Sequence, residues 1–198
     1  MKTLLAFILF ALSSLTYVNA TDNKTIRIST KDTDLILQVG ENGRLYQTYL
    51  GEKLLHEQDL QHFQWNIHAG SDGSVSKRGW EVYSGSGNED FFEPAISITH
   101  HDGNPSTILY YVSSSDKAVE GGTETIILLR DDRYPVEVTL HYIAYPKENI
   151  IKTWSEIRHQ EKKPVTLSSY ASTMLYFNNS GYYLTCLLYT SPSPRDTR

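Results

Sequence analysis

The stretch that decides the fold is VEVTLHY, residues 136–142, in which apolar and polar residues alternate. The apolar positions are Val136, Val138, Leu140 and Tyr142, and the polar positions are Glu137, Thr139 and His141. Because successive side chains of a strand point to opposite faces, this spacing predicts an antiparallel strand with one buried and one solvated face. From Thr25 onward the chain is similarly rich in β-branched and aromatic residues.

Runs of period two occur on both sides of this stretch. Residues 34–39 (DLILQV), where Leu35, Leu37 and Val39 share a face, and residues 44–50 (RLYQTYL) flank the turn sequence GENG and predict a hairpin. Further strands are expected at 95–100, 106–113, 124–130, 150–158, 165–169 and 173–177, between Gly-, Pro- and Asp-containing turns. No window after the first twenty residues keeps a helical apolar stripe, so the chain is predicted to be all-β, in two packed layers.

Composition limits the classes of function. The chain has 198 residues, of which 39% are hydrophobic and 12% aromatic, so it has enough apolar side chains for one globular unit. Its formal net charge is -5, and the longest basic clusters are the pairs Lys77-Arg78 and Lys162-Lys163. Because binding to a phosphate backbone needs a basic surface, nucleic acid is not expected as a partner.

The N-terminus resembles a cleaved secretory signal. Lys2 supplies a basic start, residues 4–12 (LLAFILFAL) an apolar run, and residues 18–20 (VNA) a small-residue ending. A membrane anchor is the alternative, but the apolar run is shorter than the roughly 20 residues that a span requires. We expect residues 1–20 to be a signal peptide, no membrane span, and an exported protein, periplasmic or extracellular.

Cysteine and histidine offer little support for a metal site. The chain to Thr185 has no cysteine, which excludes a cysteine nucleophile and cysteine ligands there. His56, His62 and His68 fall six apart and could share one face of a strand, but no carboxylate spacing supports a metal site. His100 and His101 are expected to point to opposite faces and to be solvated. No metal is predicted.

Carboxylates are the residues that a glycosidase would use, as a pair about 5 Å apart for a retaining enzyme and wider apart for an inverting one. Here they alternate with apolar residues on predicted strands or lie in turns, where a solvated position is the ordinary outcome. We expect each of them to be solvated. The set is Glu81, Glu89, Asp90, Glu93, Glu124, Asp131, Asp132, Glu137, Glu148 and Glu156.

Four aromatic residues lie near the weakly patterned region between residues 56 and 93, whose Gly- and Ser-rich sequence predicts long surface loops. They are Phe63, Trp65, Trp80 and Tyr83. Such residues could form a stacking platform for sugars. Packing under the loops is the favoured interpretation, because aromatics dominate small clusters of that kind.

Three segments together resemble the N-terminal domain of the family 36 glycoside hydrolases, the retaining α-galactosidases. They are residues 42–54 (NGRLYQTYLGEKL), 87–114 (beginning GNEDFFEPAISITHHDGN) and 134–177 (beginning YPVEVTLHYIAYPKENIIKTWSEI). Asp102-Gly103-Asn104 belongs to the second segment and recurs in the expected order. The other motif residues, taken as family structural positions, are Gly87, Asp90, Phe91, Pro94, Ala95, Tyr134, Pro135, Trp154 and Glu156.

The resemblance implies a β-supersandwich followed by a (β/α)8 barrel, which holds an Asp nucleophile and an Asp acid/base, and a small C-terminal β-domain. No KWD-type nucleophile segment occurs in this sequence. Residues 21–185 are therefore expected to be an incomplete, non-catalytic N-terminal fragment with no catalytic residue of its own. The parent would hydrolyse terminal α-galactosyl residues of oligosaccharides without a cofactor, and the resemblance allows a homo-oligomer.

A loop of the family after the early hairpin is associated with assembly and with a neighbouring subunit's active site. In this chain that interval, LQHFQWNIHAGSDGS, departs from the family pattern, so no substrate contact is carried over. The alternative function is a stand-alone carbohydrate-binding or structural β-sandwich domain of an exported protein.

The last residues, 186–198 (CLLYTSPSPRDTR), have neither strand nor helix periodicity. Residues 186–196 resemble the conceptual translation of a transposase-type sequencing adapter. A native Pro-rich linker is the alternative. We expect residues 186–198 to be a non-native tail and leave them out of the fold prediction.

Overall fold

The computed structural model describes residues 24–63, 80–87 and 93–177, and this part of the chain is all-β, as predicted. Its elements are β1 (Thr25–Ser29), β2 (Thr33–Val39), β3 (Leu45–Glu52), the 3-10 helix η1 (Glu57–Phe63), β4 (Ile96–Thr99), β5 (Leu109–Val119), β6 (Gly122–Asp131), β7 (Val136–Tyr145), β8 (Ile150–His159) and β9 (Thr166–Tyr170). Among these residues, no helix is long and apolar enough to cross a membrane.

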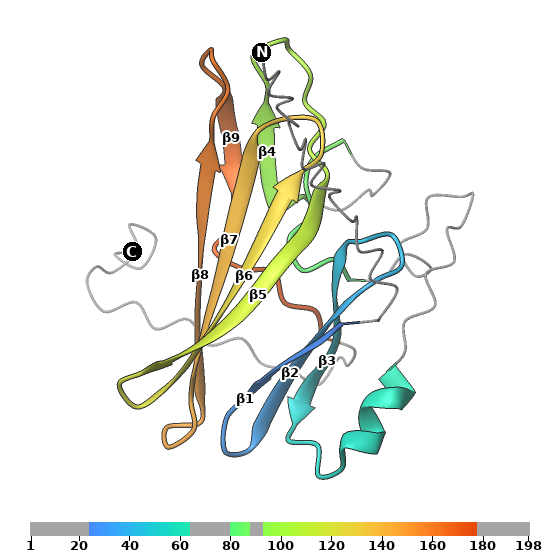
Figure 1. Ribbon diagram of the computed structural model, residues 1–198, viewed down its shortest axis with the longest axis vertical. Helices are drawn as coiled ribbons and strands as arrows, with labels where there is room; N and C mark the ends of the chain where they lie inside the picture. Colours follow the sequence, from blue (N-terminus) through green and yellow to red (C-terminus); the bar gives the residue numbers. More distant parts are fainter. Residues whose placement is uncertain (1–23, 64–79, 88–92, 178–198) are drawn as a thin grey trace, which may run out of the picture.

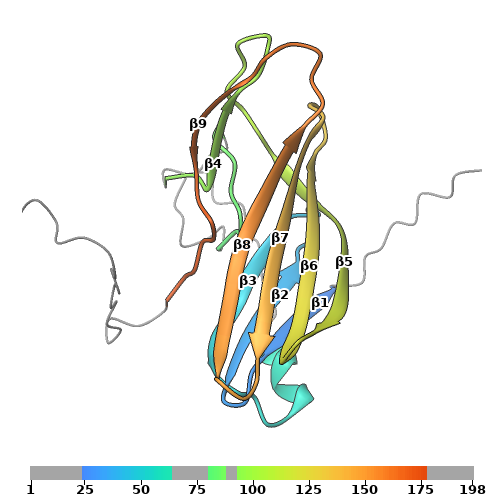
Figure 2. The same ribbon diagram turned by 90° about the vertical axis from the view of Figure 1, so that its left-hand side faces the viewer.

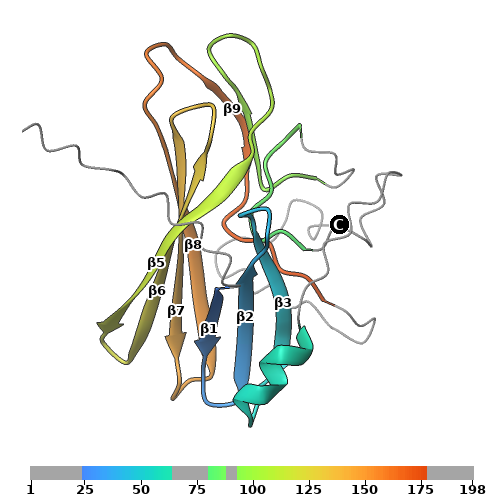
Figure 3. The same ribbon diagram turned by 45° about the vertical axis from the view of Figure 1, so that its right-hand side comes forward.

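The strands form two layers (Figures 1 and 3). One layer is an antiparallel meander in the order β5-β6-β7-β8. The other consists of the sheet β1-β2-β3 and the pair β4-β9, which lie on the same side of the meander. Figure 2 shows β4 and β9 at one end of the sandwich and β1 to β3 toward the other. This arrangement matches the expected antiparallel sandwich.

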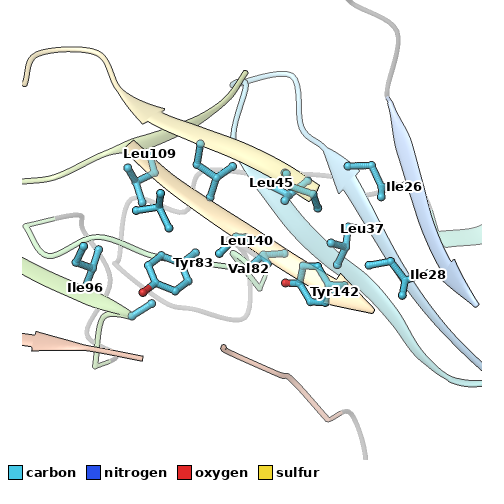
Figure 4. Packing of buried hydrophobic residues seen from close by; sticks show 14 of the residues in the cluster. Ile26, Ile28, Leu37, Leu45, Val82, Tyr83, Ile96, Leu109, Leu140 and Tyr142 are labelled. Atoms are coloured by element: carbon cyan, nitrogen blue, oxygen red, sulfur yellow. The ribbon is translucent and has the colours of Figure 1, made fainter. Parts of the chain in front are cut away.

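The core lies between the layers, and VEVTLHY supplies its centre. Val136, Val138, Leu140 and Tyr142 are at most 2% exposed and belong to one buried cluster with Leu37 and other apolar residues of the smaller sheets. Figure 4 shows Leu140 and Tyr142 in this cluster. The buried face was therefore predicted correctly. The opposite face of β7 is less open than expected, because His141 is only 9% exposed.

The predicted hairpin of β2 and β3 is present, with Gly43 in the left-handed region at its turn (φ 76°). The alternation of β2 predicted only one buried face, but its residues from Asp34 to Gln38 are all buried. β2 is the middle strand of its sheet, so neighbours on both edges reduce its exposure. Asp34 is held there by Arg27 Nη2 at 2.6 Å and Ser29 Oγ at 2.5 Å. Burial alone would raise the pKa of Asp34, but these hydrogen bonds lower it.

The structure differs from the predicted elements in three places. Residues 173–177 are not a strand, and η1 was not expected. β5 continues to Val119 rather than ending at 113, through a polar run with no alternation. The reason is pairing: β5 follows the full length of β6 up to a turn in which Gly121 has a φ of 75°. Backbone hydrogen bonds can therefore extend a strand where its side chains give no pattern.

Candidate functional site

Three loops meet at one end of the sandwich, around the carboxylate of Glu161. Its Oε1 lies 2.7 Å from Nδ1 of His100, and its Oε2 lies 2.6 Å from Nδ1 of His101. The backbone N–H of His101 also donates to Oε2, at 3.1 Å. The side chains of His100 and Glu161 are at most 1% exposed. We call these three residues, with Tyr134, the loop clamp.

His100 is the buried centre of the loop clamp. Its second ring nitrogen, Nε2, lies 3.1 Å from the carbonyl oxygen of Ser106 and 3.2 Å from Oγ1 of Thr107. A carboxylate and a carbonyl only accept hydrogen bonds, so both ring nitrogens face acceptors. Both ring nitrogens of His100 are therefore engaged, one of them with the buried Glu161 carboxylate.

Tyr134 brings the loop between β6 and β7 into the clamp. Its ring stacks on His100, with centroids 3.5 Å apart and planes 7° from parallel. Its hydroxyl donates to Oδ2 of Asp102 at 2.8 Å and accepts from Nδ2 of Asn104 at 2.9 Å. Burial would raise the pKa of Glu161, but the hydrogen bonds from His100 and His101 lower it to about 2. The clamp therefore keeps its carboxylate ionised through mildly acidic pH.

The expectation that His100 and His101 point to opposite faces was wrong, and so was the expectation that His100 is solvated, whereas His101 is exposed as expected. β4 ends at Thr99, and the turn that follows is closed by the His100 and Gly103 amides, whose acceptors are Asn104 O and His100 O. Gly103 has a φ of 89°. This turn, rather than a continuing strand, orients both rings toward Glu161. No local signal marks Glu161, because it lies about sixty residues further along the chain.

A second polar cluster lies on the outer face of the meander. His141 Nδ1 lies 2.8 Å from Oε1 of Glu124, and its Nε2 is 3.6 Å from Oε1 of Glu156. The ring stacks on Trp154, at 4.5 Å between centroids. The ammonium of Lys152 is 5.4 Å from the Trp154 ring centroid. These are cross-strand neighbours on β6, β7 and β8, and such pairs stabilise a sheet.

Three of the carboxylates expected to be solvated are buried. Glu81 pairs with Arg44, and Glu124 with His141. Asp131 accepts backbone N–H bonds from Ile108, Arg133 and Tyr134. The hydrogen-bond partners of these carboxylates lie far away in the sequence or, for Asp131, partly in its own turn. The carboxylates of Glu93, Asp132, Glu148 and Glu156 are on exposed residues, Glu137 is half-buried, and Glu89 and Asp90 lie outside the described residues.

The described residues support neither a histidine metal site nor an aromatic platform. In that part of the chain no group of three or more His, Cys, Asp or Glu side chains could hold a metal ion. His56 is exposed, whereas the His62 side chain and His68 lie outside the description. Tyr83 is buried in the core, where its hydroxyl donates to Ala171 O at 2.8 Å.

Trp80 stacks on Tyr176, with ring centroids 5.5 Å apart and planes nearly parallel. These contacts favour packing as the role of Trp80 and Tyr83. The Phe63 side chain and Trp65 lie outside the described residues.

The family motif positions do not form one site. Tyr134 belongs to the loop clamp and the adjoining Pro135 lies beside it, while Trp154 and Glu156 lie on the outer face of β8. Asp90 and Phe91 lie outside the described residues.

Gly87 and the pair Pro94-Ala95 belong to the segments that lead into β4. Gly87 has a φ of 77°, and a Cβ there would lie 2.4 Å from Oγ of Ser106, so only glycine fits. Pro94 is half-buried, and the buried Ala95 accepts a hydrogen bond from Ala171 N at 2.7 Å. Gly87 and Ala95 therefore contribute to the backbone conformation and backbone hydrogen bonds of these segments.

Comparison with known protein families gives the same family as the sequence motifs. The model of the glycosyl hydrolase family 36 N-terminal domain matches residues 43–187. No curated protein matches the chain.

Solved structures similar to this chain include the α-galactosidase AgaA of Geobacillus stearothermophilus in complex with 1-deoxygalactonojirimycin, at 22% identity and a TM-score of 0.64. Another is the α-galactosidase of Lactobacillus brevis, at 19% identity and a TM-score of 0.64. Each match covers 76% of this chain but only 24% and 23% of the relative. At these identities the solved structures show the fold, and the family model shows the family. The chain belongs to glycosyl hydrolase family 36, as its N-terminal domain.

Proposed function

We propose that this chain is the non-catalytic N-terminal domain of an exported α-galactosidase, which hydrolyses terminal α-galactosyl residues of oligosaccharides in a separate barrel domain. The observation that carries the proposal is the family match across residues 43–187. Solved relatives of the same fold are named α-galactosidases, and two of them are complexes with raffinose and stachyose. The chain corresponds to about a quarter of their length.

The ion pairs of the buried carboxylates support a non-catalytic role. A retaining glycosidase needs a nucleophile and an acid on either side of the scissile bond. Here Asp34, Glu81 and Glu124 are each engaged with a basic side chain, and Glu161 with two. A carboxylate held in such a contact is not free to act on a glycosidic bond. Catalysis is therefore assigned to another domain, and hydrolysis by two carboxylates needs no cofactor.

Export and the domain limits are part of the proposal. Residues 1–20 have the charge and length pattern of a signal peptide, which supports a periplasmic or extracellular parent. Residues 21–185 would then be the native domain and 186–198 a non-native tail. A homo-oligomer of the parent is consistent with the family resemblance.

The experiment is to determine the genomic sequence downstream of codon 185 and to express the resulting protein beside residues 21–185. We expect a barrel with an Asp nucleophile, hydrolysis of an aryl α-galactoside by the longer protein, and none by residues 21–185. A downstream sequence without a barrel would contradict the proposal, as would hydrolysis by the short form.

A titration with galacto-oligosaccharides, followed by tryptophan emission, separates the stand-alone binding module from this proposal. A saturable change at millimolar sugar with residues 21–185 would favour the binding module. A flat signal favours the enzyme domain.

A further inference from the structure

A pocket on the outer face of the meander has no part in the proposed function. It has a volume of about 270 Å³ and is lined by Arg130, Pro135, Glu137, Arg158 and Gln160. Arg130 is opposite Glu137 in the β6–β7 ladder, and Glu137 is opposite Arg158 in the β7–β8 ladder. The three side chains therefore form a row across adjacent strands, on the face away from the core.

The row has more positive than negative groups. Arg130 donates to Glu137 from both Nε and Nη2, at 2.9 and 2.7 Å, and both bonds end on Oε1. Oε2 of Glu137 accepts neither bond. Arg158 has no ion pair within the described residues. One carboxylate between two guanidiniums leaves a net positive pocket on a chain whose formal net charge is -5.

The wall of the pocket is held in place by the loop clamp. Gln160 N donates to Pro135 O at 2.9 Å, which joins the two lining segments. The next residues on each side are Tyr134, stacked on His100, and Glu161, bonded to His100 and His101. These contacts order the backbone segments at Pro135 and Gln160 before binding, which lowers the entropy cost of positioning them.

We propose that this pocket binds one anionic sugar unit, a uronic acid. The guanidinium of Arg158, with that of Arg130, would bind the ligand carboxylate, since a planar fork of N–H donors matches a carboxylate. Glu137 Oε2 and the Gln160 amide are placed to bind the sugar hydroxyls. The volume is at the small end of ligand pockets and suits a single ring rather than an oligosaccharide. This role goes beyond the proposed function and holds whether or not the parent cleaves α-galactosides.

The test uses the full chain of 198 residues and D-galacturonate as the probe, followed by two-dimensional NMR of the arginine Nε–Hε groups. D-Galactose is the neutral control, and acetate is the carboxylate without a ring. We expect saturable shifts of the Arg130 and Arg158 signals with galacturonate. We expect at least about tenfold weaker binding of galactose and acetate, because each lacks one of the two recognised groups. Arg158→Gln identifies its own signal.

Two variants test whether Arg158 and Glu137 contribute to the binding of galacturonate. Arg158→Gln should weaken galacturonate binding about tenfold or more, and Glu137→Gln should weaken it less, since an amide oxygen still accepts from hydroxyls. Lys147→Gln removes one exposed positive charge outside the pocket and should leave binding unchanged. The proposal is overturned if galacturonate causes no saturable shift at 20 mM or about that concentration. Equal binding of acetate, or equal weakening by Lys147→Gln and Arg158→Gln, would show a general ionic effect and overturn it as well.

Discussion

Two histidine–glutamate pairs occupy different regions of the molecule with almost the same contact. In the loop clamp, His100 Nδ1 and Glu161 Oε1 are 2.7 Å apart and join residues separated by 61 positions. On the outer face, His141 Nδ1 and Glu124 Oε1 are 2.8 Å apart and join residues separated by 17 positions. The second pair links strands that the backbone already pairs, whereas the first joins loop residues that lie outside the paired strands. The same contact should therefore matter more in the clamp.

Removal of the clamp carboxylate should have the largest effect. Glu161→Ala removes the buried carboxylate that both His100 and His101 contact. Breaking one partner of a buried pair typically costs about 3–5 kcal/mol in the free energy of unfolding. Urea denaturation measures it, and Glu148→Ala, at an exposed glutamate in the turn between β7 and β8, is the matched control, expected within about 0.5 kcal/mol of wild type. A loss below about 1 kcal/mol for Glu161→Ala would show that the clamp is dispensable.

The second-largest effect should come from acid, which should weaken the loop clamp. The pKa of Glu161 in the folded chain is about 2, below its ordinary value of 4.5, so the ionised group stabilises the folded state above pH 4.5. That contribution should be lost as the pH falls from 4.5 to about 2. Thermal melts across this range should show a steeper fall of Tm for wild type than for Glu161→Gln. Parallel curves for the two proteins would mean that Glu161 is not the group responsible.

The outer-face pair should tolerate replacement as a unit. Glu124→Leu alone removes the hydrogen-bond partner of the buried His141 and should cost about 1–3 kcal/mol. The double variant Glu124→Leu/His141→Leu should recover most of that loss, because apolar residues can replace a buried pair without leaving an unpaired group. A double-mutant cycle by urea denaturation gives the coupling. If the double variant is less stable than the single one, the pair contributes more than its own contact.

The smallest effect should come from the edge of the clamp. Tyr134→Phe keeps the ring stacked on His100 but removes the hydrogen bonds to Asp102 and Asn104. Because these groups are partly exposed, we expect a loss of about 0.5–1 kcal/mol in the free energy of unfolding. Tyr134→Ala, which also removes the ring, provides the contrast and should cost more. Equal losses for the two variants would place the whole contribution in the hydroxyl.

Alternation and turn residues predicted most of the strands, because each of these signals is local. The buried face of β7 and the β2–β3 hairpin follow from a few neighbouring residues. The polar end of β5 could not be predicted in this way, since its partner β6 determines its length. Residues 173–177 (TMLYF) have the apolar and aromatic composition of a strand but do not form one in the described part of the chain.

The polar clusters were beyond local prediction for a different reason. A carboxylate is expected in water unless its partner is known, and the partners of Glu81 and Glu124 come from other strands. The sequence around Glu161 gives no indication that two histidines contact its carboxylate. The family motif at Tyr134 and Asp102-Gly103-Asn104 was the one signal that pointed to the clamp region.

The connectivity of the strands has a consequence for the order of folding. β5, β6, β7 and β8 follow one another through short turns, whereas β4 pairs with β9 across the whole length of that meander. Short loops close at a lower entropy cost and faster than long ones. The meander should therefore form before β4 and β9 meet, with the clamp closing last. In pulse-labelling hydrogen exchange during refolding, the amides of Ile127 and Leu140 should be protected earlier than that of Ile98.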